Sequence, residues 1–124
     1  MNIQEQDGRV REALSRGGLI DITTTGRKSG RPHRIEIAFH NVGGQVYISG
    51  MPRAQRRSWL ANLDAEPNFT FHLKGPVQAD LPATARIIDD EEERRTVLAH
   101  IARAWKRNDL ETMVAQSPLI EVLL

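Results

Sequence analysis

The chain has 124 residues, a net charge of +1 and no cysteine. Its length is typical of one domain, and its 40% hydrophobic and 27% charged residues exclude wholesale disorder. The lack of cysteine excludes disulfides, thiolate catalysis and thiolate metal sites, and no apolar run reaches the ~20 residues that span a bilayer. We therefore expect one soluble, cytoplasmic domain over residues 1–124.

The first part of the chain alternates between strand patterns and glycine turns. Ile20, Ile22 and Thr24 recur at every second position, which is the spacing of one face of a strand. Glycine pairs at 17–18 and 43–44 mark the end of a helix and a hairpin connection. The predicted elements are a helix over 8–16, a strand over 19–25, a turn over 26–32, a strand over 34–40, a hairpin connection over 41–44 and a strand over 45–49.

The second part of the chain mixes helices with shorter strands. Trp59, Leu60 and Leu63 have helical spacing, whereas Phe69 and Phe71 alternate as in a strand. The predicted elements are a helix over 54–65, a strand over 69–73, a strand within 77–88, a helix from 89, a short helix that stops at 117–118, and a closing strand over 119–124. Hairpin-linked strands with few crossover helices predict an α+β fold. Its sheet is expected to be mainly antiparallel, curled or barrel-like, with the helices outside.

The charges are unevenly distributed along the chain. Residues 27–57 carry seven basic residues and one acid, a net charge of +6. Residues 1–26 and 58–124 have net charges of −1 and −4. A basic block of this kind favours an anionic partner.

The turn over residues 26–31 is the first candidate anion site. Two glycines let the backbone turn tightly, and Arg27, Lys28 and Arg31 project from a short span beside the Ser29 hydroxyl. Arginine can fork onto phosphate or carboxylate, and lysine adds a point charge. The alternative is an ordinary polar hairpin turn with solvated cations.

The second candidate is the segment 51–59. Arg53, Arg56 and Arg57 lie at the start of the predicted helix, where cations are unfavourable by ~0.3–1 kcal/mol each. A bound anion would reverse that penalty. The alternative is that these side chains point into solvent.

Other chemistry is poorly represented in the sequence. The four histidines lack metal-ligand spacing, no nucleophile elbow is present, and the three acids at 91–93 are typical of a solvated helix start. We therefore expect no metal site and assign no catalytic side chain. An anion site without acid–base groups suits a redox cofactor, which carries the chemistry itself.

Two motifs resemble those of the deazaflavin-dependent nitroreductase family. They are T-T-T-G-R-K-S-G-R-P over 23–32, and Trp59 followed by Asn62 and Leu63. Members of this family are actinobacterial split β-barrel oxidoreductases that use coenzyme F420. The resemblance implies a split β-barrel with flanking helices, a loop at 27–30 that holds the phosphate and oligoglutamate tail, and a segment at 49–52 along the deazaflavin ring. The implied cofactor-binding residues are Arg27, Lys28, Ser29, Gly30, His33, Arg34, Ser49, Gly50, Met51, Pro52, Arg56, Arg57, Trp59 and Asn62.

The expected activity follows from this resemblance. Reduced F420 would pass a hydride to a conjugated acceptor, namely an enone, a quinone or a nitro compound, with a proton from solvent. A homodimer is compatible with the limited surface that so small a barrel buries, and the oligomeric state is left open. Stable membrane insertion is not expected. One alternative is a barrel that binds FMN or a tetrapyrrole. Another is a nucleic-acid-binding barrel, which is disfavoured because aromatic residues, on which bases could stack, make up only 5% of the chain.

Overall fold

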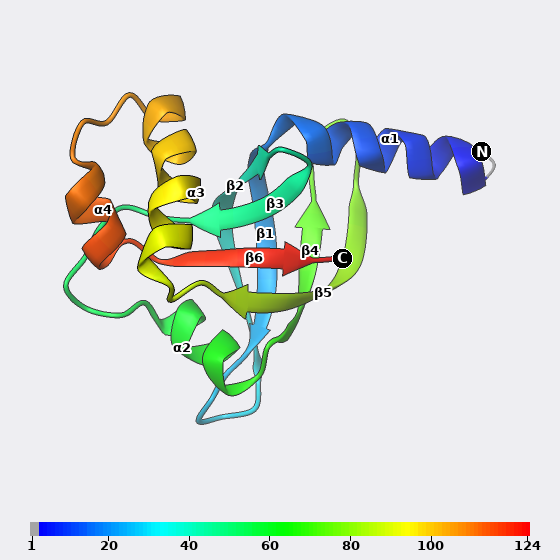
Figure 1. The fold of residues 1–124 in the computed structure, drawn as a ribbon. Coiled ribbons are helices and arrows are strands. Elements are labelled where there is room, and N and C mark those ends of the chain that lie inside the picture. The colour runs from blue at the N-terminus through cyan, green and yellow to red at the C-terminus, as the bar shows by residue number, and fades with distance from the viewer. Residues whose placement is uncertain (1–2) are drawn as a thin grey trace.

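Six strands form a closed barrel in which every neighbouring pair is antiparallel (Figure 1). The computed structural model describes the backbone from Ile3 to Leu124 and the side chains from Gly8 onward. The strands are β1 (Gly18–Thr25), β2 (Pro32–Val42), β3 (Gln45–Ser49), β4 (Asn68–Leu73), β5 (Ala79–Ile87) and β6 (Leu119–Leu123). Their order around the barrel is β1-β2-β3-β6-β5-β4. The predicted α+β, mainly antiparallel barrel is confirmed.

The barrel interior is filled by alternate side chains of these strands. Ile20 and Ile22 of β1 are completely buried, as the period of two predicts. Phe39 of β2 and Phe71 of β4 meet edge to face across the interior, with ring centroids 5.3 Å apart. Burial of each such side chain contributes ~1.5–3 kcal/mol to stability. The apolar residues that alternate in the sequence of β1 are therefore residues that stabilise the core.

Four helices cover the barrel: α1 (Ile3–Arg16), α2 (Ser58–Ala65), α3 (Glu91–Ala104) and α4 (Leu110–Gln116). Trp59 and Leu63 of α2 join the barrel core, at the end of the barrel where the β1–β2 turn lies (Figure 1). Helices α3 and α4 pack over Tyr47 of β3 and Leu119 of β6 and form a second apolar cluster. Within residues 3–124, no helix combines the length and the apolar character needed to cross a membrane.

The prediction of a helix over 54–65 is wrong at its start. Helix α2 begins at Ser58, and Arg57 before it is extended, with φ −72° and ψ 147°. The guanidinium of Arg57 donates to the carbonyl oxygen of Met51 (2.5 Å), a contact that folds residues 51–57 back as a loop. The arginines therefore do not lie in a first helical turn, and the predicted dipole penalty does not arise. We call residues 50–57 the 50–57 segment.

Candidate functional site

The β1–β2 turn, residues 26–31, forms a closed loop that we call the anion loop. The Gly26 amide donates to the carbonyl of Arg31, and the Gly30 amide donates to the carbonyl of Gly26, both at 2.8 Å. Gly30 has φ +70°, a conformation that glycine adopts without strain. A Cβ at Gly26 would lie 2.6 Å from Ser29 Oγ and 2.7 Å from His33 Nε2. Glycine at position 26 therefore lets the Ser29 and His33 side chains close over the turn.

Asn62 of α2 ties the anion loop to the barrel. Its Oδ1 accepts hydrogen bonds from the backbone amide of Arg27 (3.2 Å) and from Arg27 Nη1 (3.1 Å). Its Nδ2 donates to Thr24 Oγ1 (3.2 Å), and both Asn62 and Thr24 are buried. These hydrogen bonds fix the Arg27 guanidinium in place. Because the amide is neutral, it leaves the positive charge of Arg27 uncompensated.

The cations of the anion loop have no acidic partner among the described residues. Arg27, Lys28 and Arg31 are exposed, and none of them takes part in an ion pair of the described chain. Three positive charges thus gather on one turn, over a floor that neutral groups hold together. This arrangement suits a multivalent anion better than it suits an ordinary hairpin turn, which needs no buried anchor.

The 50–57 segment begins at the end of β3. Ser49 is buried and donates its hydroxyl hydrogen bond to the carbonyl of Pro118 (2.6 Å), so its side chain is engaged inside the fold. A Cβ at Gly50 would lie 3.2 Å from both Arg57 Cζ and Pro118 Cγ. The segment is therefore packed tightly at Gly50, where it leaves the barrel. The next residue, Met51, is half exposed.

Two arginines of the 50–57 segment lie close together. Burial, and secondly the positive charge of Arg53, lower the pKa of Arg57 from its ordinary value. Arg56 differs from both, because it forms an ion pair with Asp64 of α2 (3.1 Å). The segment thus carries one neutralised arginine and two arginines without an acidic partner in the described chain.

The anion loop, the 50–57 segment and α2 enclose a cleft of about 760 Å³, the anion-loop cleft. Eight of the predicted cofactor-binding residues line it: Arg27, Lys28, Ser29, His33, Arg56, Arg57, Trp59 and Asn62. The other six lie outside its lining: Gly30, Arg34, Ser49, Gly50, Met51 and Pro52. Arg34 follows His33 on β2 and so faces the opposite side of the sheet, where its Nε donates to Asp21 (2.9 Å).

Six residues that line the anion-loop cleft were not among the fourteen predicted cofactor-binding residues. They are Thr24, Gly26, Ile35, Arg53, Gln55 and Ser58, of which Gly26 and Arg53 belong to the two candidate anion segments. The strand alternation that placed Ile20 and Ile22 inside also places Thr24 inside, as a polar group at the end of an apolar row. A polar residue at that place in the pattern could have indicated the floor of a site.

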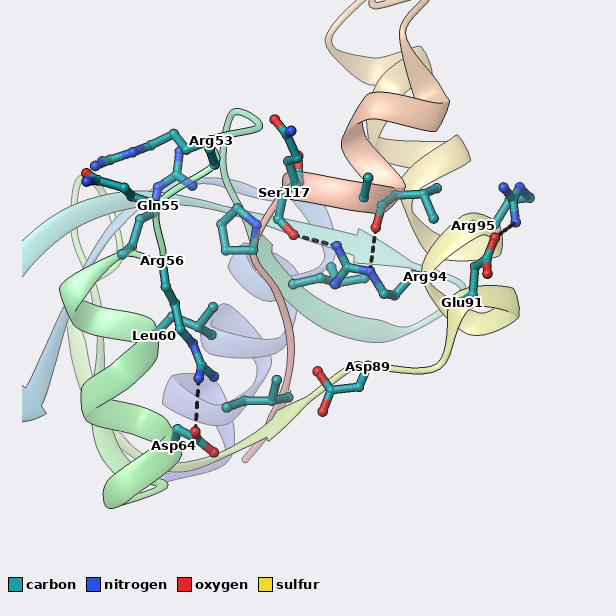
Figure 2. A pocket seen from close by; sticks show the side chains of 18 of the residues that line it. Arg53, Gln55, Arg56, Leu60, Asp64, Asp89, Glu91, Arg94, Arg95 and Ser117 are labelled. Atoms are coloured by element: carbon teal, nitrogen blue, oxygen red, sulfur yellow. Dashed lines mark hydrogen bonds and ion pairs between the residues drawn. The ribbon is translucent and has the colours of Figure 1, made fainter.

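A second cleft of about 1050 Å³ adjoins the first (Figure 2). Its wall is fixed by Arg94 of α3, whose half-buried guanidinium donates to the carbonyls of Val114 (2.9 Å) and Ser117 (2.5 Å). Burial lowers the pKa of Arg94 from its ordinary value. Arg53 and Gln55 lie together on the opposite wall, on the 50–57 segment (Figure 2).

Solved structures of other proteins share this fold. A conserved hypothetical protein from Mycobacterium tuberculosis has a TM-score of 0.74 at 15% identity, over 99% of this chain and 80% of its own. A candidate 5-nitroimidazole antibiotic resistance protein from Bacteroides thetaiotaomicron has a TM-score of 0.65 at 16% identity, over 98% and 79%. The heme storage protein HutZ from Vibrio cholerae has a TM-score of 0.65 at 13% identity, over 99% and 90%. At these identities the similarity establishes the fold alone.

A family model identifies the family of the chain, which the structural similarity does not. The model described as F420H(2)-dependent quinone reductase matches residues 1–122, nearly the whole chain. The match confirms the resemblance to F420-dependent split-barrel oxidoreductases that the motifs around Gly26 and Trp59 indicated. The chain belongs to the F420H(2)-dependent quinone reductase family.

Proposed function

We propose that the protein, acting as one split-barrel domain, binds F420 in the anion-loop cleft and reduces a conjugated acceptor: a quinone, an enone or a nitro compound. One observation carries the proposal: three cations without acidic partners in the described chain project from a loop that Asn62 holds in place. Family membership supports the identity of the reductant.

The residues of the cleft fit the proposed cofactor. F420 carries a phosphate and a tail of carboxylates, and the guanidinium of Arg27 can fork onto either group. Lys28 adds a mobile point charge, and the Ser29 hydroxyl can donate to a phosphate oxygen. The Arg27–Gly30 loop would hold the anionic tail. The family resemblance implies that backbone at 49–52, which lies outside the lining of this cleft, supports the ring, with Trp59 and Asn62 fixing the helix beside it.

When bound and reduced, F420 supplies a hydride. A quinone acceptor gains that hydride and a proton from water, and one proton returns from the cofactor to water, so that hydroquinone is formed without another reactant. The protein contributes binding and orientation, which make the transfer effectively unimolecular. In this proposal no side chain acts as a proton donor.

The first test is a fluorescence titration of the protein with F420, beside FMN at the same salt concentration. We expect micromolar or tighter binding of F420. Lys28→Ala should weaken it at least tenfold, because a charge-assisted contact of ~1.5–3 kcal/mol is lost. The matched control is Arg9→Ala, which removes an exposed positive charge on α1. Binding of FMN alone would move the chemistry to a flavin, and binding of neither would refute the proposal.

A further inference from the structure

The second cleft borders the anion-loop cleft along the 50–57 segment. Arg53, Gln55, Arg56 and Arg57 line both clefts, so a ligand in one adjoins a ligand in the other. Nine of the nineteen described residues that line the second cleft are charged, and none of those nineteen is aromatic. Such a lining suits a polar ligand better than a lipophilic one.

Most of the charges in the second cleft are already paired. Arg56 pairs with Asp64 (3.1 Å), and Arg95 pairs with Glu91 (3.2 Å) (Figure 2). Arg95 also pairs with Glu111 (2.6 Å). Arg94 binds backbone carbonyls, which occupy its donors. These groups shape the cleft but offer little charge to a ligand.

Besides Arg94, three charged groups of this cleft take part in no ion pair of the described residues: Arg53, Arg57 and Asp89. Arg57 already donates to the carbonyl of Met51. Burial and, secondly, repulsion from the Arg53 guanidinium lower the pKa of Arg57. Asp89 lies across the cleft from Arg53, on the side of Arg94 (Figure 2). The excess positive charge is therefore at the junction of the two clefts, with Arg53 its exposed member.

We propose that the hydride acceptor occupies the second cleft and carries an anionic group, a carboxylate or a sulfonate, that Arg53 binds. The inference rests on the proposed function, because it takes the anion-loop cleft as the cofactor site. An anion at the junction would relieve the repulsion between Arg53 and Arg57, and the guanidinium fork matches a carboxylate or sulfonate. Arg53 thereby selects anionic acceptors over neutral ones of the same ring system.

The test compares two naphthoquinones, one with and one without a charge. We would measure kcat/KM with F420H2 for 1,4-naphthoquinone-2-sulfonate and for 2-methyl-1,4-naphthoquinone, in the wild type, Arg53→Gln and Arg9→Gln. Tryptophan fluorescence would report binding of the sulfonate to the cofactor-free protein. The Arg53 amide donates to the Gln116 carbonyl (3.2 Å), and this backbone contact survives the substitution, so Arg53→Gln should fold normally.

We expect Arg53→Gln to lower kcat/KM for the sulfonate about tenfold and to weaken sulfonate binding by the same factor. Because Arg53 also lines the anion-loop cleft, F420 affinity is measured separately and the rates are taken at saturating F420H2, so that any loss through the cofactor appears equally with both quinones. The sulfonate should lose about tenfold more than the neutral quinone, and Arg9→Gln should behave as the wild type. Equal losses for both quinones, or no loss for either, would overturn the inference while leaving the proposed function in place. If the wild type binds F420 but oxidises F420H2 with no acceptor, the proposed function fails and this inference fails with it.

Discussion

Two charged regions of this barrel use their cations in opposite ways. On the outer face of β1 and β2, Asp21 accepts hydrogen bonds from Lys74 (2.8 Å) and Arg34 (2.9 Å), and Lys74 also pairs with Glu36. At the anion loop, Arg27 is held instead by the neutral amide of Asn62. The first region is neutralised within the chain, and the second keeps its positive charge.

The comparison shows that the number of cations does not by itself mark a binding site. Arg34 and Arg27 belong to the same basic block of the sequence. They differ in their partners: Arg34 meets a carboxylate, whereas Arg27 meets an amide. Exposed ion pairs contribute only ~0–1 kcal/mol to stability. A cation that is oriented but not neutralised is better suited to binding an anion from outside the chain.

The largest expected effect on F420 binding comes from giving Arg27 of the anion loop a carboxylate partner, as Arg34 has on the outer face. Asn62→Asp retains an acceptor for Arg27 but places a negative charge against it. The substitution also replaces the amide donor to Thr24. We expect the Kd for F420 to rise about 30-fold, because loss of a charge-assisted contact costs ~1.5–3 kcal/mol. Fluorescence titration at fixed salt would measure it.

Two further variants separate charge from shape in that experiment. Asn62→Leu removes the hydrogen bonds without adding charge, so its loss of F420 affinity should be smaller than that of Asn62→Asp. Asp21→Asn changes the charge of the outer region by one unit in the opposite direction and should leave F420 affinity unchanged. If Asn62→Leu and Asn62→Asp weaken F420 equally, the Arg27 charge is not what binds the cofactor.

The fold could be predicted from the sequence because apolar alternation and glycine turns are local signals. All six strands lie within two residues of their predicted ends. The start of α2 was missed because it depends on a contact between residues six apart, from Arg57 to the carbonyl of Met51. Helical spacing from Trp59 onward could not reveal that contact.

The candidate site could be predicted only in part. Basic residues in a glycine turn indicated the anion loop, and eight of the fourteen predicted residues line its cleft. The pairing of Arg34 with Asp21, and the burial of the Ser49 hydroxyl against Pro118, depend on which strands are neighbours in the barrel. The role of Asn62 as the anchor of Arg27 likewise needs the position of α2 beside the β1–β2 turn.

A smaller effect is expected from salt, which should act on one region more than on the other. Raising ionic strength from 0.01 M to 1 M shortens the Debye length from ~30 Å to ~3 Å. We expect F420 binding to weaken roughly tenfold over the middle of this range, since the anion loop is exposed. The free energy of unfolding should change little, because exposed ion pairs contribute little to it. Salt-independent F420 binding would show that the ring, and not the anionic tail, dominates the affinity.

The smallest effect concerns the neutralised region and its dependence on pH. Hydrogen bonds from Lys74 and then Arg34 lower the pKa of Asp21 from its ordinary value. A carboxyl with a lowered folded-state pKa stabilises the fold above its unfolded-state pKa of about 4, and this contribution disappears as the pH falls through the folded-state value. Asp21→Asn should therefore lower the urea midpoint slightly at pH 7, and this effect should shrink as the pH falls below about 4 towards the folded-state pKa.

The matched control for this pH effect is Asp64→Asn. The Asp64 side chain is 59% exposed in its pair with Arg56, whereas the Asp21 side chain is 19% exposed between two cations. Solvent screens the Asp64 pair more strongly, so its loss should shift the midpoint less at pH 7. If both variants shift the urea midpoint equally, or if the shift for Asp21→Asn persists in acid, the ion pairs of Asp21 do not cause the shift. The neutralised cations of the outer face would then add no more to stability than the unpaired cations of the anion loop.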